Sequence, residues 1–190
     1  MRRERMKKKH IKIICAISFC LLLVAQSSVI AQQRYSDQWI FMGSGGINTS
    51  AGGYYAGLGI EKILSNPASS IQAQVLFNNS KYKAGNHSTF IQNYYVMVDY
   101  AYTFFAKTAT RLSMIGGGFI GQQDFNSVIA PGIEITATPG FIYGINIAAQ
   151  IDAVISKNLS VFLQPMIIYD FGTEIDDFSV LTGIGIKYYF

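Results

Sequence analysis

The sequence predicts an all-β protein: an eight-stranded antiparallel up-and-down outer-membrane β-barrel that follows an N-terminal signal peptide. Three observations predict this fold. Apolar and polar residues alternate with period two over several long segments, no apolar run of 18 residues follows Gln32, and the last strand ends on the aromatic residue Phe190. Because every backbone N–H and C=O must be paired within the protein in hydrocarbon, a closed barrel is the alternative to a spanning helix.

The first 31 residues have the three parts of a secretory signal peptide. Seven basic residues precede Ile13, an uncharged run extends from there to Ala25, and the small-residue site 29–31 follows. The uncharged run is shorter than the roughly 20 residues of a spanning helix, so an uncleaved anchor is the weaker alternative. We therefore expect one transmembrane barrel domain over residues 32–190, located in the outer membrane of a Gram-negative bacterium.

Removal of this segment reverses the net charge. The whole chain has 15 basic and 11 acidic residues, whereas residues 32–190 have eight and ten, a net charge of −2. Direct binding of nucleic acid is therefore not expected. Cys15 and Cys20 also leave with the segment, so no disulfide framework is expected.

Eight segments are predicted as strands: 39–47, 54–63, 70–79, 90–104, 111–122, 141–155, 159–170 and 178–190. Glycines blur the alternation in the first and fifth. The fourth and sixth alternate most clearly, since Asn146, Gln150 and Asp152 fall between apolar positions of the sixth. Pro165 lies in the middle of the seventh and cannot donate to a ladder, so we expect a bulge or a local break there.

The predicted connections are 48–53, 64–69, 80–89, 105–110, 123–140, 156–158 and 171–177. Long connections tend to alternate with short ones, as in outer-membrane barrels with short periplasmic turns and longer extracellular loops. Twelve Phe, twelve Tyr and one Trp remain after residue 31, enough to populate two interfacial girdles. A soluble lipocalin-like barrel, with its apolar face inward, is the alternative fold.

Three patterns that resemble chemical sites are better explained otherwise. His87 is followed by Ser88, but adjacent side chains on an extended segment point to opposite sides. The glycine-rich string 116–121 lacks the helix that a dinucleotide site needs. The acidic residues of the last loop lack EF-hand spacing for calcium; they are Asp170, Glu174, Asp176 and Asp177. We therefore expect no enzyme activity, cofactor or metal.

Ordered glycines and aromatics recur over roughly residues 105–190. They include residues 141–144 (Phe-Ile-Tyr-Gly), residues 183–187 (Gly-Ile-Gly-Ile-Lys) and upstream positions such as Gly116 and Gly121. In these residues the C-terminal half resembles the TraO family of conjugative-transposon proteins. The family-resembling positions are Phe141, Tyr143, Gly144, Gly183, Gly185 and Lys187. The resemblance implies a non-enzymatic role in the DNA-transfer (mating) apparatus, a type IV secretion-like assembly, with other envelope proteins of that apparatus as partners.

Two functions are therefore expected as alternatives. The first is a structural or interaction barrel of the conjugation apparatus, and the second is a general small outer-membrane barrel for surface contact or envelope integrity. In either case we expect outer-membrane lipid and the barrel-assembly machinery as partners. The apolar face of the terminal strand is predicted to face lipid and to serve assembly; its residues are Ile184, Ile186, Tyr188 and Phe190.

Overall fold

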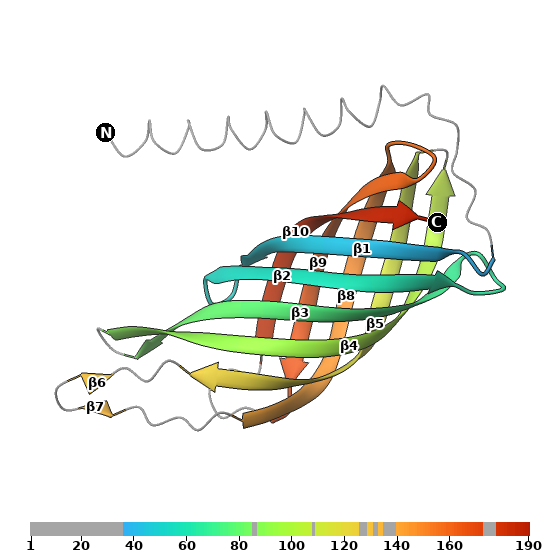
Figure 1. Ribbon diagram of the computed structural model, residues 1–190. Helices are drawn as coiled ribbons and strands as arrows, with labels where there is room; N and C mark the ends of the chain where they lie inside the picture. Colours follow the sequence, from blue (N-terminus) through green and yellow to red (C-terminus); the bar gives the residue numbers. More distant parts are fainter. Residues whose placement is uncertain are drawn as a thin grey trace, which may run out of the picture.

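In the computed structural model, eight strands close into an antiparallel barrel (Figure 1). The structure describes residues 36–84, 87–107, 109–125, 129–130, 133–134, 140–172 and 178–190. The barrel strands are β1 (Trp39–Asn48), β2 (Gly53–Ile63), β3 (Ser69–Ala84), β4 (His87–Lys107), β5 (Thr110–Phe125), β8 (Gly140–Val154), β9 (Leu159–Asp170) and β10 (Phe178–Tyr189).

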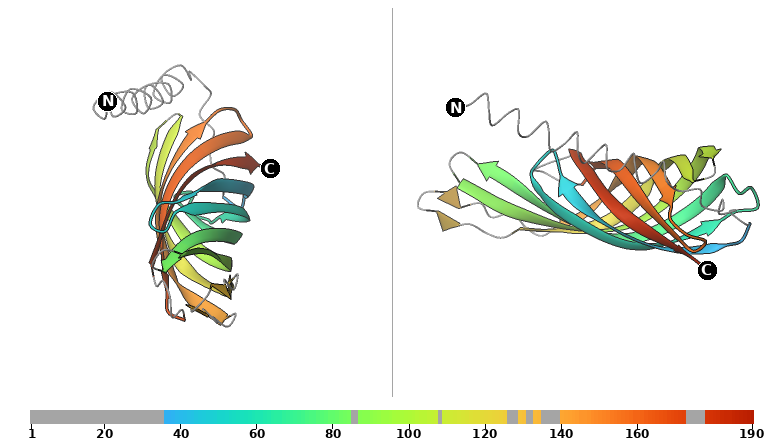
Figure 2. Two further views of the ribbon diagram at one scale, coloured as in Figure 1. Left: turned by 90° about the vertical axis from the view of Figure 1, so that its left-hand side faces the viewer. Right: turned by 90° about the horizontal axis from the view of Figure 1, so that it is seen from above.

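Each barrel strand pairs with the barrel strands before and after it in the chain, and β10 pairs with β1 to close the sheet (Figure 2). This is the predicted up-and-down order, and all eight predicted strands are confirmed. Two short strands, β6 (Ile129–Ala130) and β7 (Ile133–Glu134), pair with each other between β5 and β8 and were not predicted.

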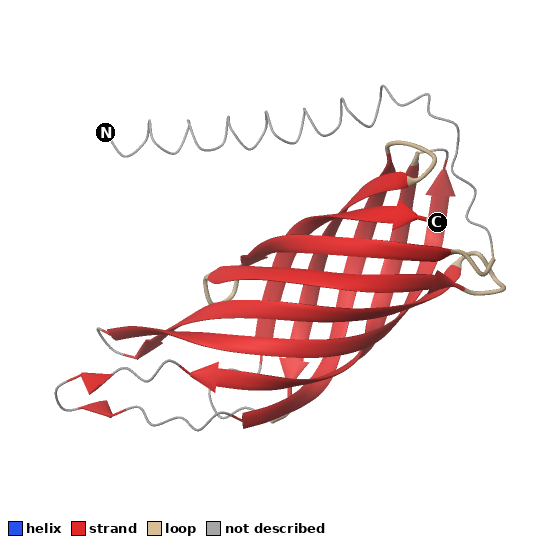
Figure 3. Cartoon of the chain, in the orientation of Figure 1, coloured by secondary structure: helices blue, strands red, loops and turns tan. Residues whose placement is uncertain are grey.

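Strands dominate the described chain, and turns or loops join them (Figure 3). The described part of the chain contains no helix that is long and apolar enough to cross a membrane. The two ends of the barrel differ in the lengths of their connections. The connections between β2 and β3, β4 and β5, and β8 and β9 lie at the end where β1 starts and β10 finishes. The other four lie at the opposite end, and they include the two longest, β5–β8 and β9–β10, so this is the end with the longer connections.

The predicted connection 80–89 is wrong, because both flanking strands extend into it. β3 and β4 remain paired as far as Ala84 and His87, so the hairpin reaches beyond the neighbouring β1–β2 turn at the left-hand end of Figure 1. β4 and β5 likewise shorten the predicted connection 105–110, and β5 continues to Phe125. A hairpin ladder needs paired backbone groups but does not need an apolar face. It can therefore continue past the apolar segment that periodicity detects.

Pro165 lies at a local break, as predicted. The β8–β9 register runs to the pair Ala148 and Met166 and resumes, unshifted, at Ile151 and Leu163. Since proline has no N–H, it cannot complete the ladder there. The described barrel strands contain a register shift elsewhere, between Thr103 and Phe105 on β4, so the bulge lies on a different strand from the proline.

The two faces of the sheet have opposite character. Along β9 the residues alternate between buried and exposed from Ser160 to Asp170, and the exposed ones are mostly apolar. On β8 the predicted polar positions Asn146, Gln150 and Asp152 are buried in the lumen, whereas Ile145 and Ile147 face outward. The apolar face is thus outside, which excludes the lipocalin-like alternative.

The lumen contains an apolar layer as well as polar residues. Tyr55, Tyr95, Phe119 and Ile142 belong to a buried apolar cluster built from side chains of most barrel strands. A smaller cluster of Ile40, Ile63 and Tyr189 lies toward the end where the chain terminates. Side chains therefore fill the interior, as expected for a barrel of eight strands.

Candidate functional site: the lumen charge cluster and the outer surface

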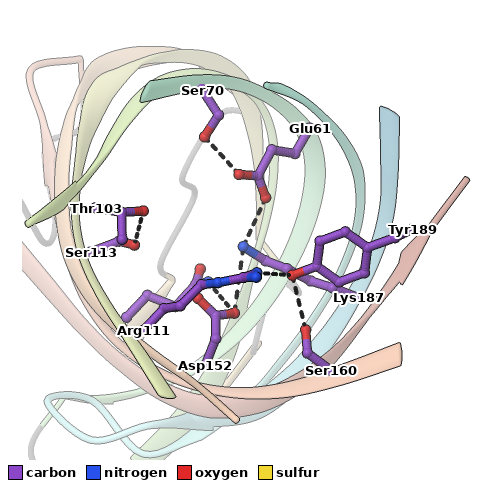
Figure 4. Close-up of polar contacts among 10 residues, drawn as sticks. Glu61, Ser70, Thr103, Arg111, Ser113, Asp152, Ser160, Lys187 and Tyr189 are labelled. Atoms are coloured by element: carbon purple, nitrogen blue, oxygen red, sulfur yellow. Dashed lines mark hydrogen bonds and ion pairs between the residues drawn. The ribbon is translucent and has the colours of Figure 1, made fainter. Parts of the chain in front are cut away.

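Four charged side chains from four different strands meet in the lumen and are here called the lumen charge cluster (Figure 4). Glu61 comes from β2, Arg111 from β5, Asp152 from β8 and Lys187 from β10. Their exposed fractions are 0%, 6%, 3% and 2%, so all four are removed from bulk water. Each lies at an inward-facing position of its strand, so all four side chains project into the lumen. Pairing of the strands brings these residues, which are distant in sequence, to one level of the barrel.

Lys187 contacts both carboxylates of the cluster. Its Nζ lies 2.7 Å from Oε2 of Glu61 and 3.6 Å from Oδ1 of Asp152. Ser70 Oγ donates a hydrogen bond to Oε1 of Glu61 at 2.6 Å. Gln150 Nε2 donates to Oδ1 of Asp152 at 2.8 Å. Each carboxylate thus receives an ammonium contact together with a neutral donor.

Arg111 is bound to the last residue of the closing strand. Its Nη1 donates to the hydroxyl oxygen of Tyr189 at 3.1 Å, and that hydroxyl lies 3.2 Å from Oγ of Ser160. With two cations and two carboxylates, the lumen charge cluster is formally neutral. Because buried ions lose their hydration, removal of one member leaves an uncompensated charge and costs far more than loss of a surface pair.

A further buried carboxylate, Asp99 on β4, is held by amides. Gln74 Nε2 and Asn146 Nδ2 each donate to it at 2.9 Å. Gly117 of β5 lies between Asp99 and Asn146 in the strand register, and a Cβ at Gly117 would overlap with the Asp99 carboxylate. The glycine-rich string 116–121 therefore lies within strand β5, where at this position the missing side chain allows Asp99 to reach across to β8.

Lumen aromatics pack against glycines of neighbouring strands. A Cβ on Gly183 would overlap with Tyr55 of β2, and a Cβ on Gly185 would overlap with the Phe162 ring of β9. A Cβ on Gly144 would lie 2.6 Å from Cζ of Phe119. At three of the family-resembling positions, a side chain would thus meet both an aromatic ring and a backbone carbonyl of a neighbouring strand.

Aromatic side chains cluster toward both ends of the outer face. At the end with the longer connections, Phe77 lies between Tyr54 and Tyr94, with ring centroids 6.1 and 5.2 Å away. At the opposite end, the rings of Tyr188 and Phe190 are 5.2 Å apart. Exposed aliphatic residues lie between the two groups, including Leu58, Val75, Val96, Val98, Ile145, Ile147, Leu163, Ile167 and Ile184. This pattern is the aromatic-girdled apolar band of transmembrane barrels.

The structure separates the predicted site residues into three groups. The terminal-strand residues all point outward and are exposed; they are Ile184, Ile186, Tyr188 and Phe190. Phe141 and Tyr143 also point outward, and their rings are stacked at 6.3 Å. Gly144, Gly183 and Gly185 lie under lumen aromatics, and Lys187 belongs to the lumen charge cluster. Of the predicted set, only Lys187 enters that cluster.

Sequence reasoning missed Glu61 and Arg111. Both lie within predicted strands, and a charged residue at the inward parity of an otherwise apolar strand was the available signal. The period of the second strand marks Ile60 as outward and Glu61 as inward. No periodicity, however, shows that Glu61 meets Lys187, which is 126 positions later in the chain.

The described part of the chain gives no geometric support for a hydrolase site at His87 and Ser88 or for a calcium site in the last loop. The side chains of His87 and Ser88 lie outside it, as do Glu174, Asp176 and Asp177. Among the residues that the structure describes, no group of three or more His, Cys, Asp or Glu side chains is arranged to hold a metal ion.

Several solved outer-membrane proteins have this fold. Neisserial surface protein A aligns with a TM-score of 0.63 at 12% identity, covering 82% of this chain and 98% of that one. A major outer membrane protein from Thermus thermophilus aligns at 0.58 and 13% identity, covering 80% and 98%. Ail, the attachment invasion locus protein of Yersinia pestis, aligns at 0.53 and 13% identity, covering 82% and 100%. At such identities these neighbours establish the fold.

The sequence comparisons are more specific. No curated protein matches the chain. The model of one family, described as conjugative transposon protein TraO, matches residues 37–190, which span the whole barrel from before β1 to the end of β10. The resemblance first seen in the C-terminal half thus extends over the N-terminal strands, and the chain belongs to the conjugative transposon protein TraO family.

Proposed function

We propose that this protein is a non-enzymatic outer-membrane component of the conjugative DNA-transfer apparatus, a type IV secretion-like assembly, with a structural or interaction role. The observation that carries the proposal is the family match over the complete barrel. The apolar outer band and its aromatic groups support insertion into outer-membrane lipid. Export through a signal peptide cleaved after residue 31, followed by insertion by the barrel-assembly machinery, is part of the proposal.

The filled lumen supports a role based on contacts rather than on transport. The described lumen side chains form an apolar layer and a neutral charge cluster, so the surfaces left for other macromolecules are the outer face and the connections. We propose loops 123–140 and 171–177 as contact regions for other envelope proteins of the apparatus. Both lie at the end with the longer connections, and the former contains the β6–β7 ribbon.

The first experiment deletes the gene from a transfer-competent donor strain. We expect transfer frequency to fall to background while growth stays normal, and a plasmid-borne copy to restore transfer. Unchanged transfer would reject the proposal. If transfer is unchanged while sensitivity to detergents or bile salts rises, the general envelope-integrity function is supported instead.

A second experiment separates contact from folding. Residues 126–139 are replaced by a short Gly/Ser linker, which leaves all eight barrel strands intact. We expect this variant to insert, to show the electrophoretic mobility of a folded barrel, and to lose both transfer and co-purification with other transfer proteins. As a matched control, a linker of the same type replaces Thr49–Gly52 in the short β1–β2 connection and is expected to retain transfer.

A further inference from the structure

The barrel is closed between the first strand and the last, and the contacts across this junction are not limited to backbone hydrogen bonds. β1 and β10 pair from Ile40 with Tyr189 to Asn48 with Leu181. Three side-chain contacts accompany this ladder and are here called the closure contacts: Tyr55 over Gly183, Phe162 over Gly185, and Glu61 with Lys187. Two of them come from β2, which is not hydrogen-bonded to β10, and these two cross the junction. The third comes from β9, on the other side of β10, and fills the lumen space over Gly185.

Tyr55 reaches β10 across a glycine of β1. In the register, Tyr55 faces Gly46, and Gly46 faces Gly183. A Cβ at Gly46 would lie 2.8 Å from Cε1 of Tyr55, and a Cβ at Gly183 would overlap with its hydroxyl. Tyr55 is 4% exposed, so its ring is held in the lumen rather than free to move aside. The ring thus requires a glycine on each of the two strands that close the barrel, Gly46 on β1 and Gly183 on β10.

Lys187 also reaches over β1. In the register it is level with Met42 and Gly59, two residues from Glu61, and its Nζ is nevertheless 2.7 Å from the Glu61 carboxylate. On its other side it contacts Asp152 of β8, beyond β9. Lys187 is therefore bound to β2 on one side of β10 and to β8 on the other, each the second strand from β10 in the barrel (Figure 4).

We propose that the closure contacts select the register in which β10 pairs with β1. A slip by one residue would turn the apolar face of β10 inward, so the nearest competing registers are slips by two. The backbone ladder alone does not distinguish these registers, because its hydrogen-bond pattern repeats every two residues.

The Tyr55 ring opposes both slips, and the Glu61–Lys187 pair opposes one of them. If Gly46 faces Gly185, Tyr55 meets the space already filled by Phe162, and Lys187 lies four residues from Glu61, about 13 Å at about 3.3 Å per residue. If Gly46 faces Leu181 instead, Lys187 becomes level with Glu61 and the ion pair survives, but the Leu181 side chain collides with Tyr55. The charge and the ring together therefore reject slips in both directions.

Cysteine pairs on the outer face test this inference, in a chain with Cys15 and Cys20 removed. Gly43 faces Ile186 in the native register, so the pair G43C/I186C reports that register. G43C/Y188C reports the slip that brings Gly185 to Gly46, and G43C/I184C reports the opposite slip. Each pair is oxidised after refolding in detergent, and cross-linking is measured by electrophoretic mobility.

With the native lumen, we expect only the G43C/I186C pair to cross-link. With Y55A, cross-linking of G43C/I184C should rise several-fold, because the ion pair survives that slip. Cross-linking of G43C/Y188C should rise several-fold when Y55A is combined with E61Q/K187Q, because the ring and the charge both oppose that slip. Y55F retains the ring and should keep the native pattern. T103V/S113A removes a buried hydrogen bond between β4 and β5, away from the closure, and should also keep it.

If Y55A and Y55A/E61Q/K187Q fold and cross-link only the native pair, the proposal is overturned. If they do not fold, the singles E61Q and Y55L are refolded by the same procedure and compared with T103V/S113A. Equal refolding yields would likewise overturn it, whereas a closure-specific loss supports it. The result does not depend on DNA transfer, so this inference and the proposed function fail independently.

Discussion

At Lys187 a single side chain contacts carboxylates on strands to both sides of the closing strand. The residue is 2% exposed and follows an outward-facing isoleucine, so the chain alternates from lipid-facing apolar surface to a buried ion within one residue. Such an ion is tolerated because Glu61 and Asp152 replace its hydration shell.

Lys187→Met is expected to lower the free energy of unfolding by about 3 to 5 kcal/mol, because it leaves two carboxylates buried without their ammonium. Urea unfolding of protein refolded in lipid vesicles measures this change. The matched control is Lys62→Met: Lys62 pairs with Asp37 at 3.6 Å, but the two side chains are 42% and 77% exposed. That control should cost less than about 1 kcal/mol. Equal effects would contradict the burial argument.

Gly183→Ala is expected to destabilise the barrel by about 1 to 3 kcal/mol, since the added Cβ overlaps with Tyr55 and with backbone of β1. Gly43→Ala is the control on the outer face, where the nearest atom, Cδ2 of Leu58, would be 3.4 Å away. This variant should leave the unfolding midpoint unchanged or slightly raised. Similar losses from both substitutions would show that strand glycines act through the backbone alone.

At the scale of one element, β10 performs two roles on its two faces. Its outward residues continue the apolar band, whereas its inward residues include Gly183, Gly185 and Lys187, which make the closure contacts. The last residue extends the ladder, because Phe190 N–H donates to the carbonyl of Trp39 at 3.1 Å and its ring packs on Tyr188.

Deletion of Phe190 is therefore expected to lower the amount of folded barrel in the outer membrane several-fold. Phe190→Tyr retains the ring and should assemble normally. Refolding of the deletion variant in detergent separates recognition by the assembly machinery from intrinsic stability: we expect it to fold in vitro even though it fails in cells. Normal insertion in cells would remove the proposed assembly role of this residue.

Elements differed in how well the sequence predicted them. The long alternating segments on β4 and β8 were found because their outer faces are almost wholly apolar. The extensions of β3, β4 and β5 and the β6–β7 ribbon were not, since they lie beyond the apolar band or in a connection and are maintained by backbone pairing. The break at Pro165 was predictable because it follows from the chemistry of one residue.

For the whole molecule, the filled lumen predicts that the monomer does not conduct. Purified protein in a planar bilayer should give no stable conductance steps, because the apolar layer around Tyr55, Tyr95 and Phe119 lies across the lumen. A porin reconstituted in the same bilayer shows that the assay detects a channel. Reproducible steps from the purified protein would contradict the closed interior.

The sequence by itself determined the number of barrel strands, the period-two faces and the family resemblance, because these are local properties that repeat along the chain. The tertiary structure alone decided which face is inside, since alternation is identical for a barrel with its apolar face in or out. It also decided that Glu61, Arg111 and Asp152 meet Lys187 and its neighbours. Contacts across a lumen depend on closure and register, and these are properties of the whole sheet.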